Sequence, residues 1–272
     1  MMIKHVESVD KTFLLQIANE HLGINYFILL GLSISKMIYK EIYYFHNSHT
    51  NALEAVLLKR NSGNLQLMCR CEKCSQEVCR DFQSLIQELD FRELIASYNT
   101  MAAIAAEILF TTHKPGALIS LAHNIRLSTE NLPVGGQLRP LKAGDVNLIE
   151  ALYKEVFQSF TPAEVIRKKL EMGRGRGLGL FLNNTLIAVA QTDFETMDKA
   201  IIVGVATHPS HQHQGYGHLI MSALCQPLID EGKELILHYN NDIAGKLYKK
   251  MGFKQTDQIG HYSKTDLLSK SI

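Results

Sequence analysis

The chain has 272 residues, which is long for one compact domain and sufficient for two. Its 28 basic and 27 acidic side chains give a formal net charge of +1, so it lacks the basic excess with which proteins neutralise nucleic-acid phosphates. The longest apolar run, residues 26–32, is less than half of the ~20 residues that a bilayer requires, and residues 1–7 lack the apolar core of a signal peptide. We therefore expect a soluble cytoplasmic protein with no nucleic-acid partner and no membrane partner.

The first half of the chain alternates helical and strand-like patterns. Apolar periodicity predicts helices at residues 12–20, 25–35, 78–89 and 101–109. Apolar or β-branched runs predict strands at residues 42–45, 52–58, 64–69, 94–97 and 117–121. The turn formers Asn61-Ser62-Gly63 would join two of these strands. These patterns predict a smaller α/β domain over residues 1–128.

Four of the five cysteines lie close together in this half, at Cys69, Cys71, Cys74 and Cys79. An odd total without a secretion signal favours reduced thiols over a disulfide framework. The Cys71-x-x-Cys74 spacing is that of a zinc knuckle, and Cys69 or Cys79 could complete such a site. A structural zinc site usually uses a second, distant pair, however, and this sequence has none. Free thiols with no required metal are the prediction, and a zinc site is the alternative.

A segment rich in turn formers separates the two halves. Residues 128–145 contain Pro133, Pro140 and a Gly-Gly pair, with few large apolar residues. A short strand is predicted at 137–141, followed by a helix that Asp145 could cap.

A second helix is predicted to begin at Thr161-Pro162-Ala163-Glu164. Threonine would be its N-cap, proline its first residue, and Glu164 would complete a capping box. Two strands, 178–182 and 186–192, then form a hairpin around Asn183-Asn184. A turn at 195–198 leads into a third strand at 200–207.

The stretch from Ile201 to Gly217, IIVGVATHPSHQHQGYG, is the most informative part of the sequence. A β-branched strand ends near Thr207, a polar loop follows, and an apolar-periodic helix then begins. A helix N-terminus after such a loop presents unpaired backbone N–H groups to an anion. Gly215 and Gly217 leave the main chain bare, so a bulky diphosphate could approach it. A turn that needs glycine for local reasons is the plain alternative.

A second informative stretch follows between residues 237 and 253. A strand-like run at 235–237 leads to Asn240-Asn241-Asp242, which offers a helix N-cap. One face of the predicted helix carries its apolar residues, namely Ala244, Leu247, Tyr248 and Met251. Gly252 then has the place of a C′ residue that ends the helix, and Phe253 begins another strand.

Together these two stretches resemble the signatures of the GNAT superfamily of N-acetyltransferases. Gln212-x-x-Gly215-x-Gly217 resembles the loop that binds the pyrophosphate of acetyl-coenzyme A. The second signature is matched in register by Asn241, Ala244, Leu247, Tyr248, Lys250, Gly252 and Phe253. The order of predicted elements from residue 137 to 272 is also that of the GNAT fold.

The resemblance implies an α+β (mixed α/β) fold over residues 137–272. Its centre would be a mostly antiparallel, twisted sheet flanked by helices. The element order of residues 1–128 resembles the degenerate GNAT-like half that precedes the active half in some tandem members. An unrelated α+β domain is the alternative for that half.

The resemblance also implies acetyl-CoA as cosubstrate and assigns residues to it. Val205, Ala206 and Thr207 would bind the pantetheine arm as an added strand, mainly through backbone groups. The pyrophosphate would meet the backbone N–H groups of His213, Gln214, Gly215, Tyr216, Gly217 and His218. Gln212 holds a place where the family has Arg or Gln, and His213 or His218 could supply part of the missing charge. Asn241 would bond to the pantetheine amides, cap its own helix, or do both.

Tyr248 is the candidate catalytic residue, because it holds the place of a family tyrosine near the coenzyme sulfur. It would protonate the leaving thiolate; a core tyrosine is the alternative. The candidates for a general base are Glu155, Asp193, Glu195 and His208, but many family members use a water chain, so no base is assigned.

The expected activity is acetyl transfer from acetyl-CoA to a primary amine of a small molecule, an amino acid derivative or a peptide. A non-catalytic acyl-CoA-binding sensor or interaction protein is the alternative. The sequence patterns indicate neither the acceptor amine nor the oligomeric state.

Overall fold

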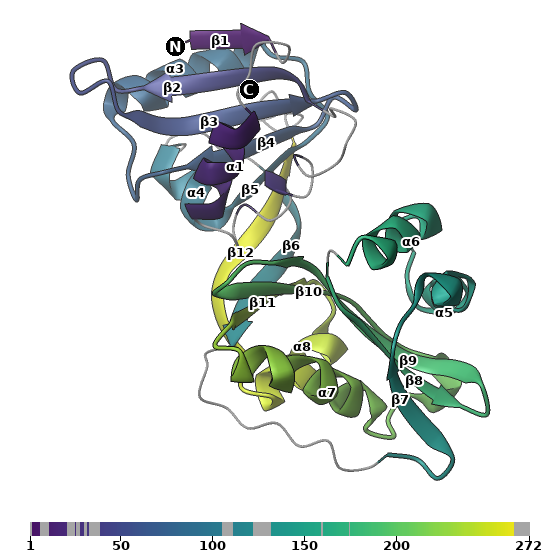
Figure 1. The fold of residues 1–272 in the computed structure, drawn as a ribbon. Helices are drawn as coiled ribbons and strands as arrows, with labels where there is room; N and C mark the ends of the chain where they lie inside the picture. The colour runs from purple at the N-terminus through teal and green to yellow at the C-terminus, as the bar shows by residue number, and fades with distance from the viewer. Residues whose placement is uncertain are drawn as a thin grey trace. The chain divides into compact units, whose positions relative to one another are not determined.

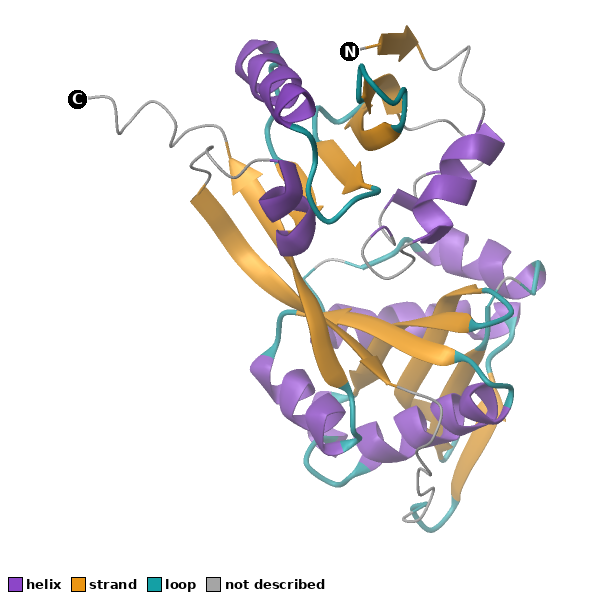
Figure 2. Cartoon of the chain, turned by 90° about the vertical axis from the view of Figure 1, so that its left-hand side faces the viewer, coloured by secondary structure: helices purple, strands orange, loops and turns teal. Residues whose placement is uncertain are grey.

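The computed structural model describes residues 2–5, 11–20, 25, 28–29, 32, 39–104, 111–121, 132–158, 160–173 and 175–263. Its contacts divide the chain into two compact units, one of residues 1–118 with 256–272 and one of residues 119–255. Both units combine helices with a β-sheet (Figures 1 and 2). Within the described ranges, no helix combines the length and the apolar character needed to cross a bilayer.

The second unit is built on a sheet with the strand order β11-β10-β9-β8-β7. The strands are β7 (Gly136–Pro140), β8 (Gly177–Leu182), β9 (Thr185–Glu195), β10 (Lys199–Thr207) and β11 (Glu234–Tyr239). Neighbours are antiparallel from β7 to β10, whereas β10 and β11 are parallel. The expected mixed α/β fold with a mostly antiparallel sheet is therefore confirmed.

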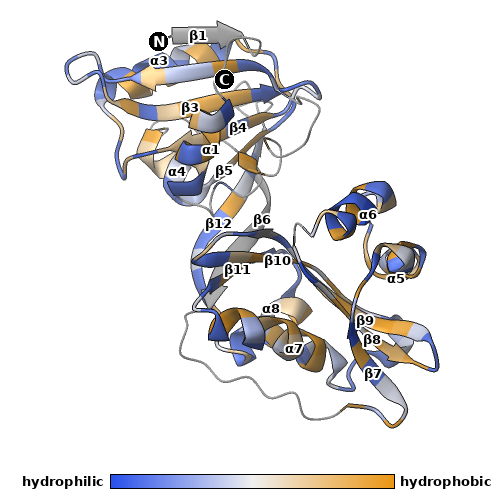
Figure 3. Cartoon of the chain, viewed as in Figure 1, coloured by the Kyte–Doolittle hydropathy of each residue, from blue (hydrophilic) through white to orange (hydrophobic). Residues whose placement is uncertain are grey.

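Helices cover both faces of this sheet. They are α5 (Val146–Val156), α6 (Ala163–Glu171), α7 (Tyr216–Asp230) and α8 (Asp242–Lys250). Figure 1 shows α5 and α6 on one side of the strands and α7 on the other. Hydrophobic residues are concentrated in the strands and in α7 (Figure 3), as burial on both faces of a sheet requires. The core between α5 and the sheet includes Ile149, Tyr153, Val189 and Ala206.

Several local predictions for this half are confirmed. Asn183 and Asn184 both have positive φ, 49° and 64°, as a two-residue hairpin turn of the primed type requires. The Asn241 side chain caps α8 by accepting from the N–H groups of Ile243 and Ala244, at 2.8 and 3.5 Å.

The end of α8 is a Schellman motif, as the glycine at its C′ position predicts. Gly252 has φ +94°, and its N–H bonds to the Lys249 carbonyl at 3.0 Å. The Phe253 N–H bonds to the Tyr248 carbonyl, also at 3.0 Å, and the two rings pack with their centroids 5.9 Å apart. This motif turns the chain sharply from helix α8 toward the next strand.

Two predicted helix caps are wrong. Asp145 precedes α5 but makes no capping bond; it lies in a 3-10 turn, Ala143–Asp145, and accepts both guanidinium bonds of Arg139 at 2.8 Å. A bidentate charged pair is stronger than a neutral cap bond, so the carboxylate turns to the strand rather than to the helix. Helix α6 begins after Pro162 without a side-chain cap, and Glu164 pairs with Lys168 instead of closing a box with Thr161.

The first unit has a sheet of related topology, in the order β1-β2-β3-β4-β5-β12. Its strands are β1 (Met2–His5), β2 (Tyr39–His46), β3 (Leu53–Arg60), β4 (Leu65–Cys69), β5 (Leu94–Ser97) and β12 (Lys254–Ser263). Pairing is antiparallel from β1 to β4 and parallel between β4 and β5. Each unit therefore has an antiparallel run followed by one parallel pair, and in the first unit β5 also pairs with β12 in the antiparallel sense.

The described helices of this unit are α1 (Lys11–Glu20), α3 (Gln76–Glu88) and α4 (Tyr98–Ile104). Helix α3 connects β4 to β5, as α7 connects β10 to β11. The buried core around α3 includes Phe45, Leu57, Phe82 and Leu94. Strand β6 (Thr111–Leu121) begins six residues before the predicted start at residue 117. Strand β1 was not predicted from the sequence.

Parts of three predictions lie outside the described residues: most of the 25–35 helix, the end of the 101–109 helix and the start of the 128–145 boundary. The division into domains 1–128 and 137–272 stays a prediction. By contacts, residues 256–263 at the end of β12 group with the first unit, where β12 pairs with β5.

Candidate active site

Strands β10 and β11 pair only over their first residues. The parallel register runs from Lys199 opposite Glu234 to Ile202 opposite Leu237. In the described backbone no β10–β11 pair follows, although β10 continues to Thr207. The backbone of residues 203–207 therefore offers a strand edge to which an extended ligand can bond as an added strand.

A bulge in β10 marks the point where the strands separate. The β9–β10 register shifts between Val203 and Ala206, and Gly204 has φ +60°. The Tyr153 hydroxyl of α5 donates to the Gly204 carbonyl at 2.8 Å and accepts from Gln191 Nε2 at 2.7 Å. A Cβ atom at Gly204 would lie 2.0 Å from the Tyr153 oxygen, so the site requires glycine. Helix α5 thus holds the bulge in place.

The loop after β10 leads directly into the N-terminus of α7. It contains a 3-10 turn, Pro209–His211, and two residues with positive φ, His213 at 62° and Gly215 at 85°. Gly215 is the N-cap and has no side chain to offer, and the first helical bond runs from the Leu219 N–H to its carbonyl at 3.0 Å. The N–H groups of residues 216–218 therefore have no acceptor within the helix, and they lie at the positive end of its dipole.

The free strand edge and the helix N-terminus border one cavity of about 660 Å³. The predicted site residues that line it are Val205, Ala206, Thr207, Gln212, His213, Gly215, Gly217, His218, Asn241 and Tyr248. Gln214 and Tyr216 were predicted with them but are not among its lining residues. The structure thus brings the two sequence signatures together around one space, and the roles of these residues stay predictions.

Sequence reasoning missed six lining residues: Val156, His211, Ile243, Ala244, Leu247 and Lys250. The last three belong to the second signature, so their membership in it was the available signal. Ile243 is 67% exposed, which is unusual for an isoleucine and suits a side chain that packs against a ligand. Nothing in the local sequence marks Val156, because it comes from α5, far away along the chain.

The lining favours an anionic ligand. Its titratable side chains are His211, His213, His218, Lys250 and Tyr248, and none of the described lining residues is Asp or Glu. Gln212 turns inward on the loop, since its Nε2 donates to the Thr207 carbonyl at 3.1 Å. Positive charge and backbone N–H donors therefore occur together without a competing carboxylate.

Tyr248 combines a packed ring with access to the cavity. The residue is 5% exposed, and its ring lies 5.6 Å from that of Tyr239 and 5.9 Å from that of Phe253, centroid to centroid. Burial raises the pKa of its hydroxyl above the usual range. The phenol is therefore protonated at neutral pH and can act only as a donor of its proton.

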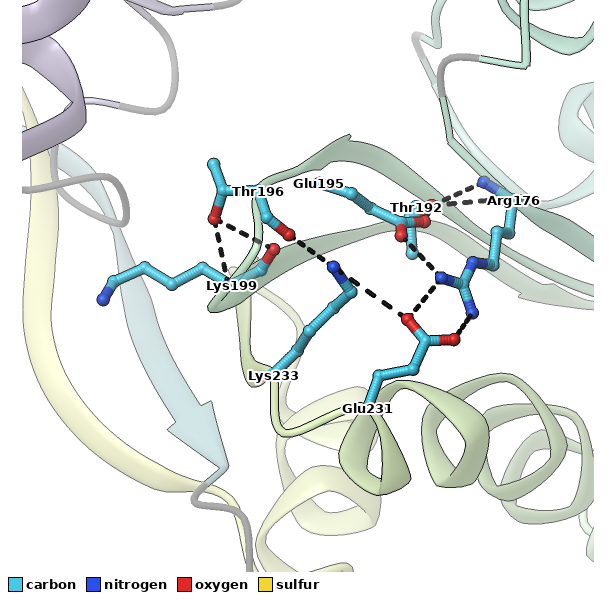
Figure 4. A network of polar contacts seen from close by, with 7 residues as sticks. All are labelled: Arg176, Thr192, Glu195, Thr196, Lys199, Glu231 and Lys233. Atoms are coloured by element: carbon cyan, nitrogen blue, oxygen red, sulfur yellow. Dashed lines mark hydrogen bonds and ion pairs between the residues drawn. The ribbon is translucent and has the colours of Figure 1, made fainter.

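The candidate general bases lie elsewhere, and two of them are engaged in ion pairs. Figure 4 shows Glu195 held by Thr192, whose hydroxyl donates at 2.6 Å, and by Arg176 Nη2 at 3.1 Å. Arg176 also makes two bonds of 2.6 Å to Glu231, and Lys233 Nζ donates to the Thr196 carbonyl. This network fastens the β9–β10 turn to the end of α7.

The other three candidates for the general base also lie outside the cavity lining. Asp193 pairs with Lys169 at 3.4 Å. The His208 Nδ1 atom lies 2.8 Å from the Ser210 hydroxyl. Glu155 is exposed on α5. None of the four described candidates lines the cavity, so no side chain is assigned as base.

Comparisons with known proteins agree with this geometry. The model of the acetyltransferase (GNAT) family matches residues 146–253, which include the cavity and both signatures. A search of curated protein sequences found no match.

Solved structures of similar fold cover nearly the whole chain. A GNAT-family acetyltransferase from Colwellia psychrerythraea is 15% identical, with 97% of this chain and 99% of that chain covered and a TM-score of 0.70. A GCN5-related N-acetyltransferase from Sphaerobacter thermophilus is 12% identical, covering 97% and 95%, with a TM-score of 0.64.

A tandem GNAT protein from the clavulanic acid biosynthesis pathway is also similar. It is 13% identical, with 96% of this chain and 98% of that chain covered and a TM-score of 0.65. At these identities the likeness concerns the fold, and a tandem protein of the same extent fits the expected GNAT-like N-terminal half.

Proposed function

Residues 146–253 form a GNAT acetyltransferase domain, and on this premise we propose that the protein is an acetyl-CoA-dependent N-acetyltransferase. The acceptor is a primary amine of a small molecule, an amino acid derivative or a peptide. The observation that carries the proposal is that a free β10 edge and a bare α7 N-terminus meet at one cavity whose described lining residues include no carboxylate.

Acetyl-CoA fits this cavity in two parts. The pantetheine arm carries amide groups, which can bond to the backbone of residues 205–207 as a neighbouring strand would. The pyrophosphate carries negative charge, which the N–H groups at the start of α7 and the side chains of His213, His218 and Lys250 would neutralise.

The reaction joins the amine nitrogen to the acetyl carbon and breaks the bond between that carbon and the coenzyme sulfur. The neutral amine nitrogen loses one proton, which passes to water, and the departing thiolate gains one from the Tyr248 hydroxyl; the phenolate then regains a proton from water. The Asn241 Oδ1 atom accepts the hydrogen bond that caps α8, so its Nδ2 group is the part of the side chain that would donate to the pantetheine. No described feature favours the acyl-CoA sensor over the enzyme, and a cytoplasmic location stays a prediction.

A direct assay tests the activity. The full chain is incubated with acetyl-CoA and a panel of primary amines, and free coenzyme thiol is measured with a thiol reagent. We expect thiol release that depends on one class of amine, together with the acetylated amine by mass spectrometry. Tight acetyl-CoA binding with no transfer to any amine would support the sensor instead.

A further inference from the structure

The cysteines of the first unit occupy the place that the coenzyme loop has in the second. Strand β4 ends at Cys69, the loop that follows carries Cys71 and Cys74, and α3 begins at Gln76 with Ser75 as its N-cap. In the second unit the loop between β10 and α7 borders the cavity. The same connection therefore carries thiols in one unit and a glycine-bearing anion loop in the other.

The Cys74 sulfur lies close to two other sulfur atoms of this cluster. The Cys71 and Cys74 sulfurs are 3.4 Å apart, and the Cys74 and Cys69 sulfurs are 3.8 Å apart. Four ligands arranged tetrahedrally around zinc at about 2.3 Å would place their sulfur atoms roughly 3.8 Å from one another. The two separations are close to that spacing, so the Cys74 sulfur lies at ligand-to-ligand distance from both Cys71 and Cys69.

A carboxylate from the neighbouring strand joins the thiols. The oxygen of Glu54 on β3 and the sulfurs of Cys71 and Cys74 all lie within 4.8 Å of one another. The loop is shaped around this carboxylate, because Ser75 N donates to Glu54 Oε2 at 2.7 Å and Asn47 Nδ2 donates to Oε1 at 2.9 Å. Among the described ion pairs, none joins Glu54 to a Lys or Arg, so a cation at the thiols would be its electrostatic partner.

We propose that Glu54, Cys71 and Cys74 bind one zinc ion, and that Cys69, whose sulfur is 3.8 Å from that of Cys74, moves toward the ion to become the fourth ligand. Carboxylate oxygen and thiolate sulfur are both zinc ligands, and four protein ligands make a closed structural site. Each coordinating thiol loses its proton to the solvent as the metal–sulfur bond forms. The ion would tie β3, β4 and the start of α3 together, on the connection that in the other unit holds the coenzyme.

A Cys71–Cys74 disulfide is the competing use of these sulfurs. It would leave Cys69 and Glu54 without a role in the cluster. Zinc accounts for all four groups together.

Metal analysis of the full chain tests the site. The reduced protein is loaded with Zn²⁺, freed of unbound ion and measured by elemental analysis; we expect one zinc per chain. Loading with Co²⁺ should give the absorption of tetrahedral cobalt with thiolate charge transfer. Protein that retains no zinc and gives no such spectrum would overturn the proposal, as would loss of two thiols in air to a metal-free disulfide.

Matched variants locate the ion. Cys71→Ser and Glu54→Gln should each weaken zinc binding, measured by competition with a chromophoric chelator. Loss of a residue that only hydrogen-bonds to a metal ligand already costs about 10–100-fold in affinity, so loss of a ligand itself should cost at least that. Cys225→Ser, a buried thiol on α7 in the second unit, is the control and should bind zinc as the wild type does. Circular dichroism confirms folding, and wild-type affinity in both folded ligand variants would overturn the assignment.

Discussion

Tyr248 is both a core residue and a wall of the cavity, and its burial limits what it can do as an acid. Burial raises the pKa of the hydroxyl, and the neighbouring Cys225 and Tyr239 raise it further. A thiol has a pKa near 8.5, so proton transfer from the tyrosine to a free thiolate is uphill. The donor therefore contributes most when the proton moves as the carbon–sulfur bond breaks, and we expect an effect of roughly 10²-fold or less.

Tyr248→Phe should lower kcat and kcat/KM together, by about 10–100-fold, and leave the dissociation constant of acetyl-CoA nearly unchanged. A hydroxyl that acts only in the transition state behaves in this way. Steady-state kinetics and calorimetry measure the two quantities. Tyr239→Phe, which removes a hydroxyl from the packed neighbour, is the control and should keep full activity. Full activity in Tyr248→Phe would remove the tyrosine from the mechanism.

The raised pKa of Tyr248 also predicts the shape of the pH profile. Donation requires the protonated phenol, and a folded pKa above the reference value of about 10 keeps it protonated through the neutral and mildly basic range. We therefore expect that ionisation of Tyr248 does not lower kcat at any pH below about 10. The pH profiles of the wild type and of Tyr248→Phe should have the same shape in this range. A falling limb between pH 7 and 9 that disappears in the variant would contradict the burial argument.

At the residue scale, sequence alone predicted the parts of the site that local geometry determines. Gly215, Gly217 and Asn241 are recognisable because a bare loop and a helix cap each require a particular residue type. His211 and Val156 were missed, since a loop histidine has no diagnostic spacing and a helix residue reaches the cavity only through tertiary packing. The sequence also did not show that the candidate bases lie outside the described cavity lining. Ion-pair partners such as Arg176, which engages Glu195, are distant from them in the sequence.

At the scale of elements, the β10 bulge is the feature that opens the site. A glycine inside a strand often marks a bulge, but the sequence does not reveal that Tyr153 and Gln191 hold it. The two hydrogen bonds of the Tyr153 hydroxyl connect helix α5, strand β9 and the bulge. Helix α5 therefore fixes the point at which β10 leaves β11.

Tyr153→Phe should reduce the free energy of unfolding by about 1–3 kcal/mol, because it leaves the half-buried Gly204 carbonyl and the buried Gln191 amide without this partner. The bulge should also loosen, so acetyl-CoA should bind more weakly. Chemical denaturation and calorimetry measure the two effects. A variant with weaker stability but unchanged acetyl-CoA affinity would show that the bulge holds its shape without the tyrosine.

Helix ends show which local signals survive in the folded chain. The Asn241 cap and the Gly252 terminus are confirmed because their partners lie within the same helix. The Asp145 cap failed because Arg139, six residues earlier, offers the carboxylate a bidentate charged partner. A local cap signal thus fails where a charged side chain pairs with the capping residue, as Arg139 does with Asp145 and Lys168 with Glu164.

At the scale of the whole molecule, the chain repeats one arrangement of strands and helices in two units. The sequence predicted this order in both halves, because alternating patterns mark the element types. It did not predict that residues 256–263 group with the first unit, since strand pairing between β12 and β5 depends on contacts that no local pattern encodes. The coenzyme signatures, by contrast, lie wholly within the second unit.

Acetyl-CoA should therefore stabilise mainly the second unit. At a ligand concentration 100 times its dissociation constant, binding to the native state alone adds about 2.7 kcal/mol. In differential scanning calorimetry we expect two transitions, one of which moves to higher temperature with added acetyl-CoA. An equal shift of the entire unfolding profile would show instead that both units unfold as one.

The central claim is that the α7 N-terminus and the free β10 edge bind acetyl-CoA, and two glycine variants isolate it. Gly215 and Gly232 both have positive φ, +85° and +81°, and open space around the Cβ position, but only Gly215 lines the cavity. Their replacement by glutamate should strain the backbone equally, whereas only Gly215→Glu places a carboxylate against the diphosphate.

Isothermal titration calorimetry with acetyl-CoA makes this comparison most directly. For the wild type we predict a dissociation constant in the submicromolar to tens-of-micromolar range. The corresponding free energy of binding is roughly −7 to −9 kcal/mol. Gly232→Glu should retain this affinity, and folded Gly215→Glu should show no measurable binding. Equal affinity in the two variants, or no binding by the wild type, would contradict the account.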